Sequence, residues 1–221
     1  MDSRFEHLRY VAVDGPIGVG KTTFCRLLAD KLEGHAMLED ATGNPFLEEF
    51  YRNRERYAFQ TQTYFLLSRY AQQRELNEYD LFKSRIVADY TFEKDALFAE
   101  VNLSEAEFNI YRQVAALLRK DLPKPDLVVF LTASLEVLLA RIKRRDHQAD
   151  RSIDPAYLAE IVEAYNHHFF HYEETPLLVV KTDQLDFVEN SKHLREIFAQ
   201  IAVMRQGTRY YATGDDLLGK K

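Results

Sequence analysis

Residues 10 to 23 read Tyr10-Val11-Ala12-Val13-Asp14-Gly15-Pro16-Ile17-Gly18-Val19-Gly20-Lys21-Thr22-Thr23, and this junction decides the fold. The apolar run at its start predicts a buried strand that ends at Asp14. The segment that follows fits the pattern G-x-x-x-x-G-K-[ST] at every fixed position. In such a junction the backbone N–H groups of the glycine-rich turn surround phosphate oxygens, above the N-terminus of a helix. An ordinary glycine-rich turn is the alternative, and the strand before the motif favours nucleotide binding.

Two side chains of this segment have predicted roles of their own. Lys21 is expected to reach the terminal phosphates of the nucleotide. Thr22 is expected to hold Mg²⁺ through its hydroxyl oxygen, because hard cations prefer oxygen ligands. We therefore predict that residues 15 to 23 bind Mg·ATP.

The bulk composition is that of an ordinary globular protein. The chain has 221 residues, of which 46% are hydrophobic and 29% charged, and this length favours one domain over residues 1–205. A net charge of −6 and an isoelectric point near 5.7 argue against a large nucleic-acid interface. No apolar stretch approaches membrane-spanning length, and the first residues lack a signal-peptide pattern, so we expect a cytoplasmic protein that binds no membrane.

Apolar runs that look like buried parallel strands alternate with segments of helical periodicity, which predicts an α/β fold. A capping box at Ser104 and Glu107, and the pair Asp154-Pro155, mark two helix starts. From Gln206 onward the periodicity is lost, and residues 206–221 are expected to be a poorly ordered tail. The five predicted strands are Tyr10–Val13, Ala36–Leu38, Ile86–Ala88, Leu127–Leu131 and Leu177–Val180.

A basic cluster narrows the class of nucleotide-binding protein. Arg141, Arg144 and Arg145 are spaced three and four residues apart at the end of a predicted helix, which groups their guanidinium groups on one face. Such arginines can close over a triphosphate as a lid and neutralise the moving phosphoryl group. A solvated helix end is the alternative reading of the cluster. The chain has no Asn-Lys-x-Asp tetrapeptide, which disfavours a guanine-specific switch.

Several further segments, in order and spacing, resemble the deoxynucleoside kinase family up to about residue 203. This resemblance implies a three-layer α/β/α fold with a five-stranded parallel sheet in the order 2-3-1-4-5 and an arginine lid at about 142–152. It implies Mg²⁺ and ATP as well, and a homodimer formed through long helices such as Glu55–Glu78 and Ser104–Lys120. The segments are Glu39 ahead of Asn44-Pro45, Tyr51, Arg56 to Gln62, Leu67-Ser68-Arg69, Asp89 to Phe98, Arg141 with Arg145 and Asp150, and Leu185-Asp186-Phe187.

The resemblance also implies a role for each residue. Glu39 would contact the 5′-hydroxyl of the nucleoside and take its proton, while Asp89 is either a second candidate base or orients water on Mg²⁺. Lys21, Arg141 and Arg145 would stabilise the transferring phosphoryl group. The remaining roles are base recognition for Gln62, Arg69 and Asp95, ring packing for Phe98, 3′-hydroxyl binding for Tyr51 and Asp150, and a border to the adenine of ATP for Asp186 and Phe187.

The chain departs from the family pattern at Tyr90, where the family normally has arginine. Tyr90 stays among the expected substrate-binding positions, but a cation near the transferring phosphoryl group is missing, so activity or substrate could differ. The favoured function is phosphorylation of a purine deoxynucleoside by ATP. A thymidylate-type monophosphate kinase and a catalytically silent ATP-binding protein remain as alternatives.

Overall fold

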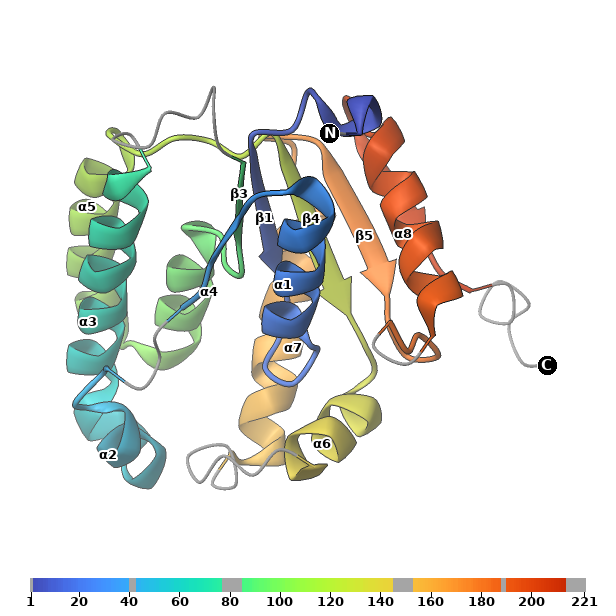
Figure 1. Ribbon diagram of the computed structural model, residues 1–221. Helices are drawn as coiled ribbons and strands as arrows, with labels where there is room; N and C mark the ends of the chain where they lie inside the picture. Colours follow the sequence, from blue (N-terminus) through green and yellow to red (C-terminus); the bar gives the residue numbers. More distant parts are fainter. Residues whose placement is uncertain (1, 40–42, 77–84, 145–152, 188–189, 214–221) are drawn as a thin grey trace.

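The computed structural model describes residues 2–39, 43–76, 85–144, 153–187 and 190–213, and a six-stranded sheet lies at their centre. All neighbouring strands of this sheet are parallel (Figure 1). Across the sheet the strands are β2 (His35–Met37), β3 (Ile86–Ala88), β1 (Tyr10–Asp14), β4 (Leu127–Thr132), β5 (Leu177–Lys181) and β6 (Thr208–Tyr211).

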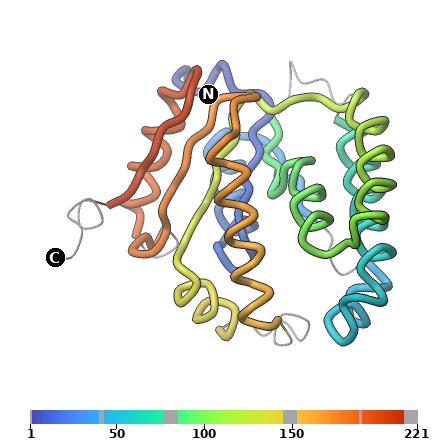
Figure 2. Tube along the Cα trace, turned by 180° about the vertical axis from the view of Figure 1, so that it is seen from behind, coloured from blue at the N-terminus to red at the C-terminus, as the bar shows by residue number. Residues whose placement is uncertain are grey.

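Helices cover both faces of the sheet. On one face lie α1 (Lys21–Leu32) and α8 (Ser191–Val203), and on the other lie α4 (Glu93–Asn102) and α7 (Pro155–Phe170), as Figure 1 and the reverse view in Figure 2 show. Two long helices pack outside α4, and two short ones lie near the carboxyl ends of the strands. These are α3 (Arg54–Glu75), α5 (Glu105–Arg119), α2 (Leu47–Arg52) and α6 (Leu135–Arg144), and a 3₁₀ turn at Ser3–Phe5 precedes the sheet.

The local signals in the sequence explain why these elements form. Every residue of β1 and β3 is buried, as expected for strands with helices on both sides. The Ser104 side chain accepts from the backbone N–H of Glu107, and the Glu107 side chain accepts in return from the Ser104 N–H, so the predicted capping box is confirmed. Asp154 caps α7 through the N–H of Ala156, with Pro155 in the first turn.

The α/β class and the five predicted strands are confirmed, but the count of strands was too low. Thr208–Tyr211, which we expected to lie in a disordered tail, forms β6 and pairs with β5. The strand has good strand formers in Thr208, Tyr210 and Tyr211, but it is a short edge strand whose side chains are mostly exposed. It therefore lacks the apolar run that identified the other strands. Residues 214–221 lie outside the described residues.

A buried carboxylate fixes the edge of the sheet where the strands end. Asp14, the last residue of β1, is fully buried, and its Oδ1 accepts from the N–H of Gly15 at 2.7 Å and from the Tyr165 hydroxyl at 2.9 Å. Its Oδ2 accepts from the backbone N–H of Thr91 at 3.1 Å. The start of the glycine-rich loop, the chain after β3 and helix α7 are thereby held together.

In the part of the chain that the structure describes, no helix has the length and apolar character needed to span a membrane.

Candidate active site

The glycine-rich loop lies between β1 and α1, and its backbone adopts conformations that favour glycine. Gly18 has φ +84° and Gly20 has φ +104°, both in the left-handed region. A Cβ atom on Gly18 would come within 2.7 Å of Ile142 Cγ1. Helix α1 has no side-chain cap at its N-terminus, so its first N–H groups are available to an anion. The loop therefore has the form expected of a phosphate-binding site.

Lys21 is held across the mouth of this loop. Its Nζ donates to the carbonyl oxygens of Gly15 at 2.8 Å and Pro16 at 3.1 Å. Burial, reinforced by the nearby positive charge of Lys94, lowers the pKa of Lys21 to about 8. A bound phosphate would favour the protonated lysine, because an opposite charge at close range offsets the desolvation.

Asp89 connects the phosphate loop with the residues after β2. Its Oδ2 accepts from the Thr22 hydroxyl at 2.7 Å, and its Oδ1 accepts from the backbone N–H of Glu39 at 2.7 Å. Asp89 follows β3, which lies between β2 and β1 in the sheet, so the topology puts this carboxylate between the two segments. One carboxylate thus fixes the position of Thr22 relative to Glu39.

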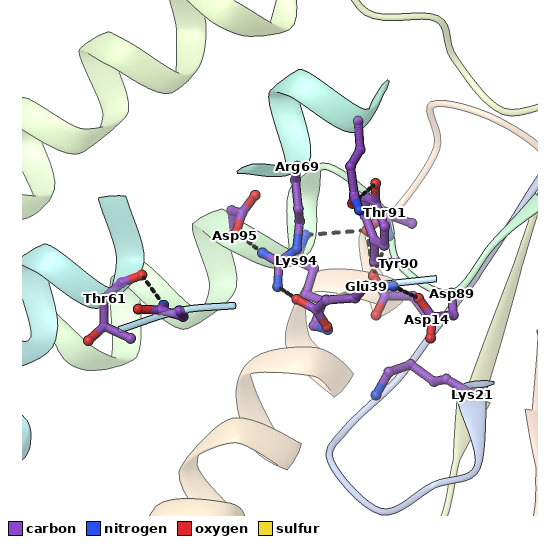
Figure 3. Close-up of polar contacts among 12 residues, drawn as sticks. Asp14, Lys21, Glu39, Thr61, Arg69, Asp89, Tyr90, Thr91, Lys94 and Asp95 are labelled. Carbon is purple, nitrogen blue, oxygen red and sulfur yellow. Dashed lines mark hydrogen bonds and ion pairs between the residues drawn. The ribbon is translucent and has the colours of Figure 1, made fainter. Parts of the chain in front are cut away.

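Glu39 lies in a cluster of charges drawn from three segments (Figure 3). Its Oε1 pairs with Arg69 on α3 and its Oε2 pairs with Lys94 on α4, while its side chain is only 16% exposed. Burial by itself raises the pKa of Glu39, but the combined attraction of Arg69 and Lys94 is stronger and holds the pKa below its usual range. The carboxylate is therefore ionised at neutral pH.

A second ion pair extends this cluster toward the predicted base pocket. Arg69 also pairs with Asp95, and both side chains are almost completely buried. Gln62 is buried as well and precedes Arg69 by seven residues, or two helical turns, so both lie on the same side of α3. Phe98 follows Lys94 by one turn of α4, and the Lys94 ammonium lies 5.9 Å from the centre of its ring.

Tyr90 lies behind the cluster. Its ring is fully buried and its centre is 5.6 Å from the Arg69 guanidinium, while its hydroxyl donates to Gln72 Oε1 at 2.9 Å. Figure 3 shows Tyr90 between Asp89 and Arg69. Among the described residues, the Tyr90 ring contacts the Arg69 guanidinium, while its hydroxyl hydrogen-bonds to Gln72 and Met37 and not to Glu39.

The phosphate loop has further contacts with residues from the C-terminal half of the chain. Arg141 on α6 donates to the carbonyl oxygen of Val19 at 3.2 Å and to that of Thr182 at 2.6 Å, which brings the start of the predicted lid to the phosphate loop. The buried ring of Phe187 packs edge-on against Phe24 of α1, with ring centres 5.4 Å apart.

The other predicted site residues lie beside the phosphate loop, farther from the charge cluster around Glu39, or outside the described residues. Phe187 also lies next to the loop, because a Cβ on Gly20 would be 3.0 Å from its Cζ. Asp186 is exposed beside it, and Tyr51 is half-buried on α2 next to Phe50, with ring centres 5.5 Å apart. Arg145 and Asp150, together with most of the predicted lid, lie outside the described residues.

Lys94 is the residue of this cluster that sequence reasoning missed. A lysine in the first turn of a helix opposes the helix dipole, which favours acidic side chains there, such as its neighbours Glu93 and Asp95. That mismatch is a signal in the sequence, but it does not reveal the partner. Only the packing of α4 against the segment after β2 brings Lys94 to Glu39.

Comparisons with known proteins agree with this geometry. The model of the family described as deoxynucleoside kinase matches residues 11–204. A deoxyguanosine kinase of Bacillus subtilis (strain 168) is 34% identical over 197 residues, covering 87% of this chain and 95% of that protein. A deoxyadenosine kinase of Lactobacillus acidophilus is 31% identical over 208 residues, covering 88% and 95%.

A solved structure of a deoxynucleoside kinase is also similar to this chain. A deoxyadenosine kinase from M. mycoides, solved with bound dCTP, aligns with a TM-score of 0.74 and 25% identity, over 87% of this chain and 98% of that one. The family model covers most of the phosphate loop's junction and the whole charge cluster together, because its match spans residues 11–204. The chain therefore belongs to the deoxynucleoside kinase family.

Proposed function

We propose that this kinase transfers the γ-phosphoryl group of ATP to the 5′-hydroxyl of a purine deoxynucleoside. The single observation that carries the proposal is the double contact of Asp89, which joins Thr22 of the phosphate loop to the backbone of Glu39. A phosphate bound at the loop would then lie opposite the Glu39 carboxylate, because the Asp89 side chain fixes Thr22 and the backbone of Glu39 relative to each other. The purine preference is supported by the names of the relatives, a deoxyguanosine kinase and a deoxyadenosine kinase.

Glu39 would orient the acceptor hydroxyl. The 5′-hydroxyl donates a hydrogen bond to the carboxylate, and its oxygen attacks the γ-phosphorus as the bond from that phosphorus to the β–γ bridging oxygen breaks. ADP leaves with the electron pair of that bond, and the hydroxyl proton passes to Glu39. Because Arg69 and Lys94 hold the pKa of Glu39 below its usual range, this proton moves late, after the attacking oxygen has become acidic. Little base strength is needed for such a transfer.

Thr22 and Asp89 are the residues that would hold Mg²⁺, Thr22 directly and Asp89 through water. The fit rests on their chemistry, because a hydroxyl and a carboxylate oxygen 2.7 Å apart are donors that Mg²⁺ prefers. Kinase sites typically supply only one or two protein ligands and leave the rest to phosphates and water. When bound with ATP, the ion would neutralise charge on the β- and γ-phosphates.

The acceptor base would lie against the buried polar residues of α3 and α4. Gln62 offers a donor and an acceptor together, which can pair with one edge of a base. The Arg69–Asp95 ion pair would contribute to the same recognition. A base that lacks matching groups leaves these buried atoms unsatisfied, and this is the physical source of selectivity.

The assay that tests this function compares acceptors. Wild-type protein is incubated with ATP, Mg²⁺ and each of the four common deoxynucleosides or their 5′-monophosphates, and both ADP release and the product mass are recorded. We expect deoxyguanosine or deoxyadenosine to be the acceptor and its 5′-monophosphate to be the product. The kcat/KM for this purine deoxynucleoside should be about tenfold or more above that for the pyrimidine deoxynucleosides. Faster turnover of monophosphate acceptors would favour a thymidylate-type enzyme. ATP binding without any product would favour the silent ATP-binding protein.

A homodimer through α3 and α5 is also proposed. These helices lie side by side at one edge of the molecule (Figures 1 and 2), and α5 exposes a stripe of apolar side chains at Ile110, Val114 and Leu117. Leu67 on α3 is 50% exposed. Sedimentation should give about twice the chain mass of 25.9 kDa, and Leu117→Glu should reduce it to the monomer. Val203→Glu, on the exposed surface of α8, is the matched control, and a monomeric wild type would contradict the proposal.

A further inference from the structure

Lys94 presents a buried positive charge at the acceptor side of the site. The residue is 5% exposed, and its ammonium group pairs with Glu39 Oε2 (Figure 3). Desolvating an ammonium group is costly unless a partner offsets it, and the first turn of a helix adds a further unfavourable contribution. Both local factors disfavour lysine at this position. Residues that violate local preferences in this way are commonly found at functional sites.

The pairing around Glu39 is unequal on its two sides. Arg69 divides its charge between Glu39 and Asp95, so it is compensated whatever happens to Glu39. Among the described residues, Lys94 has Glu39 as its only recorded carboxylate partner. If Glu39 becomes neutral, Lys94 loses this partner, whereas Arg69 keeps Asp95.

The position of Lys94 relative to the phosphate loop completes the argument. Lys94 is close enough to Lys21 for its charge to disfavour the protonated form of that loop lysine. Lys94 therefore pairs with the candidate base and is also within electrostatic range of the lysine expected at the terminal phosphates. Tyr90, at the position where an arginine is expected, has its hydroxyl bound to Gln72 and supplies no charge.

We propose that Lys94 is a catalytic residue whose ammonium group binds the oxygen atoms of the transferring phosphoryl group. The inference rests on the proposed phosphoryl transfer. As the bond from the 5′-oxygen to the γ-phosphorus forms and the bond to the bridging oxygen of ADP breaks, the hydroxyl proton passes to Glu39. Glu39 becomes neutral and releases Lys94. Late in the transfer, as the proton shifts toward Glu39 and the bond from the 5′-oxygen to the γ-phosphorus forms, the charge of Lys94 neutralises the oxygens of the phosphoryl group.

The decisive variant removes the charge but keeps a donor. Lys94→Gln can still donate a hydrogen bond to Glu39, so a role limited to packing or hydrogen bonding would survive it. We expect its kcat to fall about 100-fold or more, a loss typical of one missing electrostatic contact to a transition state. The Kd values for ATP and for the nucleoside, measured by calorimetry, should change less than about threefold. Lys94→Arg, which keeps the charge, should recover most of the lost kcat.

Controls separate this proposal from effects on folding and from the function itself. Lys192→Gln, whose side chain is 73% exposed on α8, should behave as wild type. Melting temperature and circular dichroism establish that each variant is folded, and if Lys94→Gln is not, Lys94→Met replaces it in the same assay. A folded neutral variant within about threefold of wild-type kcat would overturn the role of Lys94, and so would a loss confined to KM. A wild type inactive on all deoxynucleosides would instead overturn the proposed function.

Discussion

The donor and acceptor halves of this site are built in different ways. The phosphate-binding part of the donor half is one continuous segment, in which the loop backbone, Lys21 and the start of α1 follow each other directly. The acceptor half consists of single side chains from separate segments, with Glu39 after β2, Arg69 on α3, and Lys94 and Asp95 on α4. The donor half depends on backbone conformation, whereas the acceptor half depends on the balance of buried charges.

This difference has a functional meaning. A backbone cradle recognises phosphate, which every nucleoside triphosphate carries, so it can be the same in many proteins. Side chains from several elements can be changed one at a time, and each change alters which acceptor is bound. Substitutions in the two halves should therefore have separable effects, and the following changes test that separation from the largest expected effect to the smallest.

Glu39→Gln should have the largest effect. It removes the proposed acceptor of the hydroxyl proton and the negative charge between Arg69 and Lys94, so we expect kcat to fall about 1,000-fold. The affinity for ATP, measured by calorimetry, should be unchanged because the phosphate loop is intact. Glu48→Gln is the control, since its side chain is 76% exposed on α2. Unchanged kcat in the Glu39 variant would show that this carboxylate is not used in the reaction.

Thr22→Val disrupts the donor half with little change of volume. It removes the hydroxyl that contacts Asp89 and is proposed to hold Mg²⁺. We expect the Mg²⁺ concentration needed for half-maximal activity to rise about 10- to 100-fold, while the nucleoside Kd stays within about threefold. Thr208→Val on the exposed strand β6 should leave both quantities unchanged. An unaltered Mg²⁺ requirement would argue against the assigned ligand.

Asp95→Asn tests the acceptor half alone. It leaves Arg69 with Glu39 as its remaining carboxylate partner and should weaken nucleoside binding by about 2 kcal/mol, or about 30-fold. The Kd for ATP should not change, and this serves as the internal control. Equal losses for both substrates would mean that the two halves are not separable in the way proposed here.

Gly18→Ala should have the smallest of these effects. Its positive φ and the approach of Ile142 predict strain of about 1–2 kcal/mol in the loop, which lowers ATP affinity about tenfold. Nucleoside affinity should remain as in wild type. Gly207 also has a positive φ, but no atom lies within 4 Å of a Cβ built there. Gly207→Ala is therefore the control, because it introduces backbone strain far from the site.

The same contrast explains how much could be predicted from the sequence. The phosphate loop, the strand before it and the helix after it were predictable because the motif is contiguous and its periodicity is local. Strand β6 was missed because an exposed edge strand carries no apolar run.

The acceptor half was only partly predictable. Resemblance to a family indicated Glu39, Arg69 and Asp95, and the structure brings these three residues together. Their roles in catalysis and binding remain predictions. Lys94 could not be assigned in advance, since its partner lies 55 residues away in the chain and meets it only through the packing of α4.

The double contact of Asp89 also has a thermodynamic consequence. Because one carboxylate holds both Thr22 and the backbone of Glu39, a ligand that orders either segment also orders part of the other. Each substrate should then prepare the site for its counterpart, and linkage requires the two enhancements of affinity to be equal. The kinase would thus favour the ternary complex over either binary one, which limits transfer of the phosphoryl group from ATP to water.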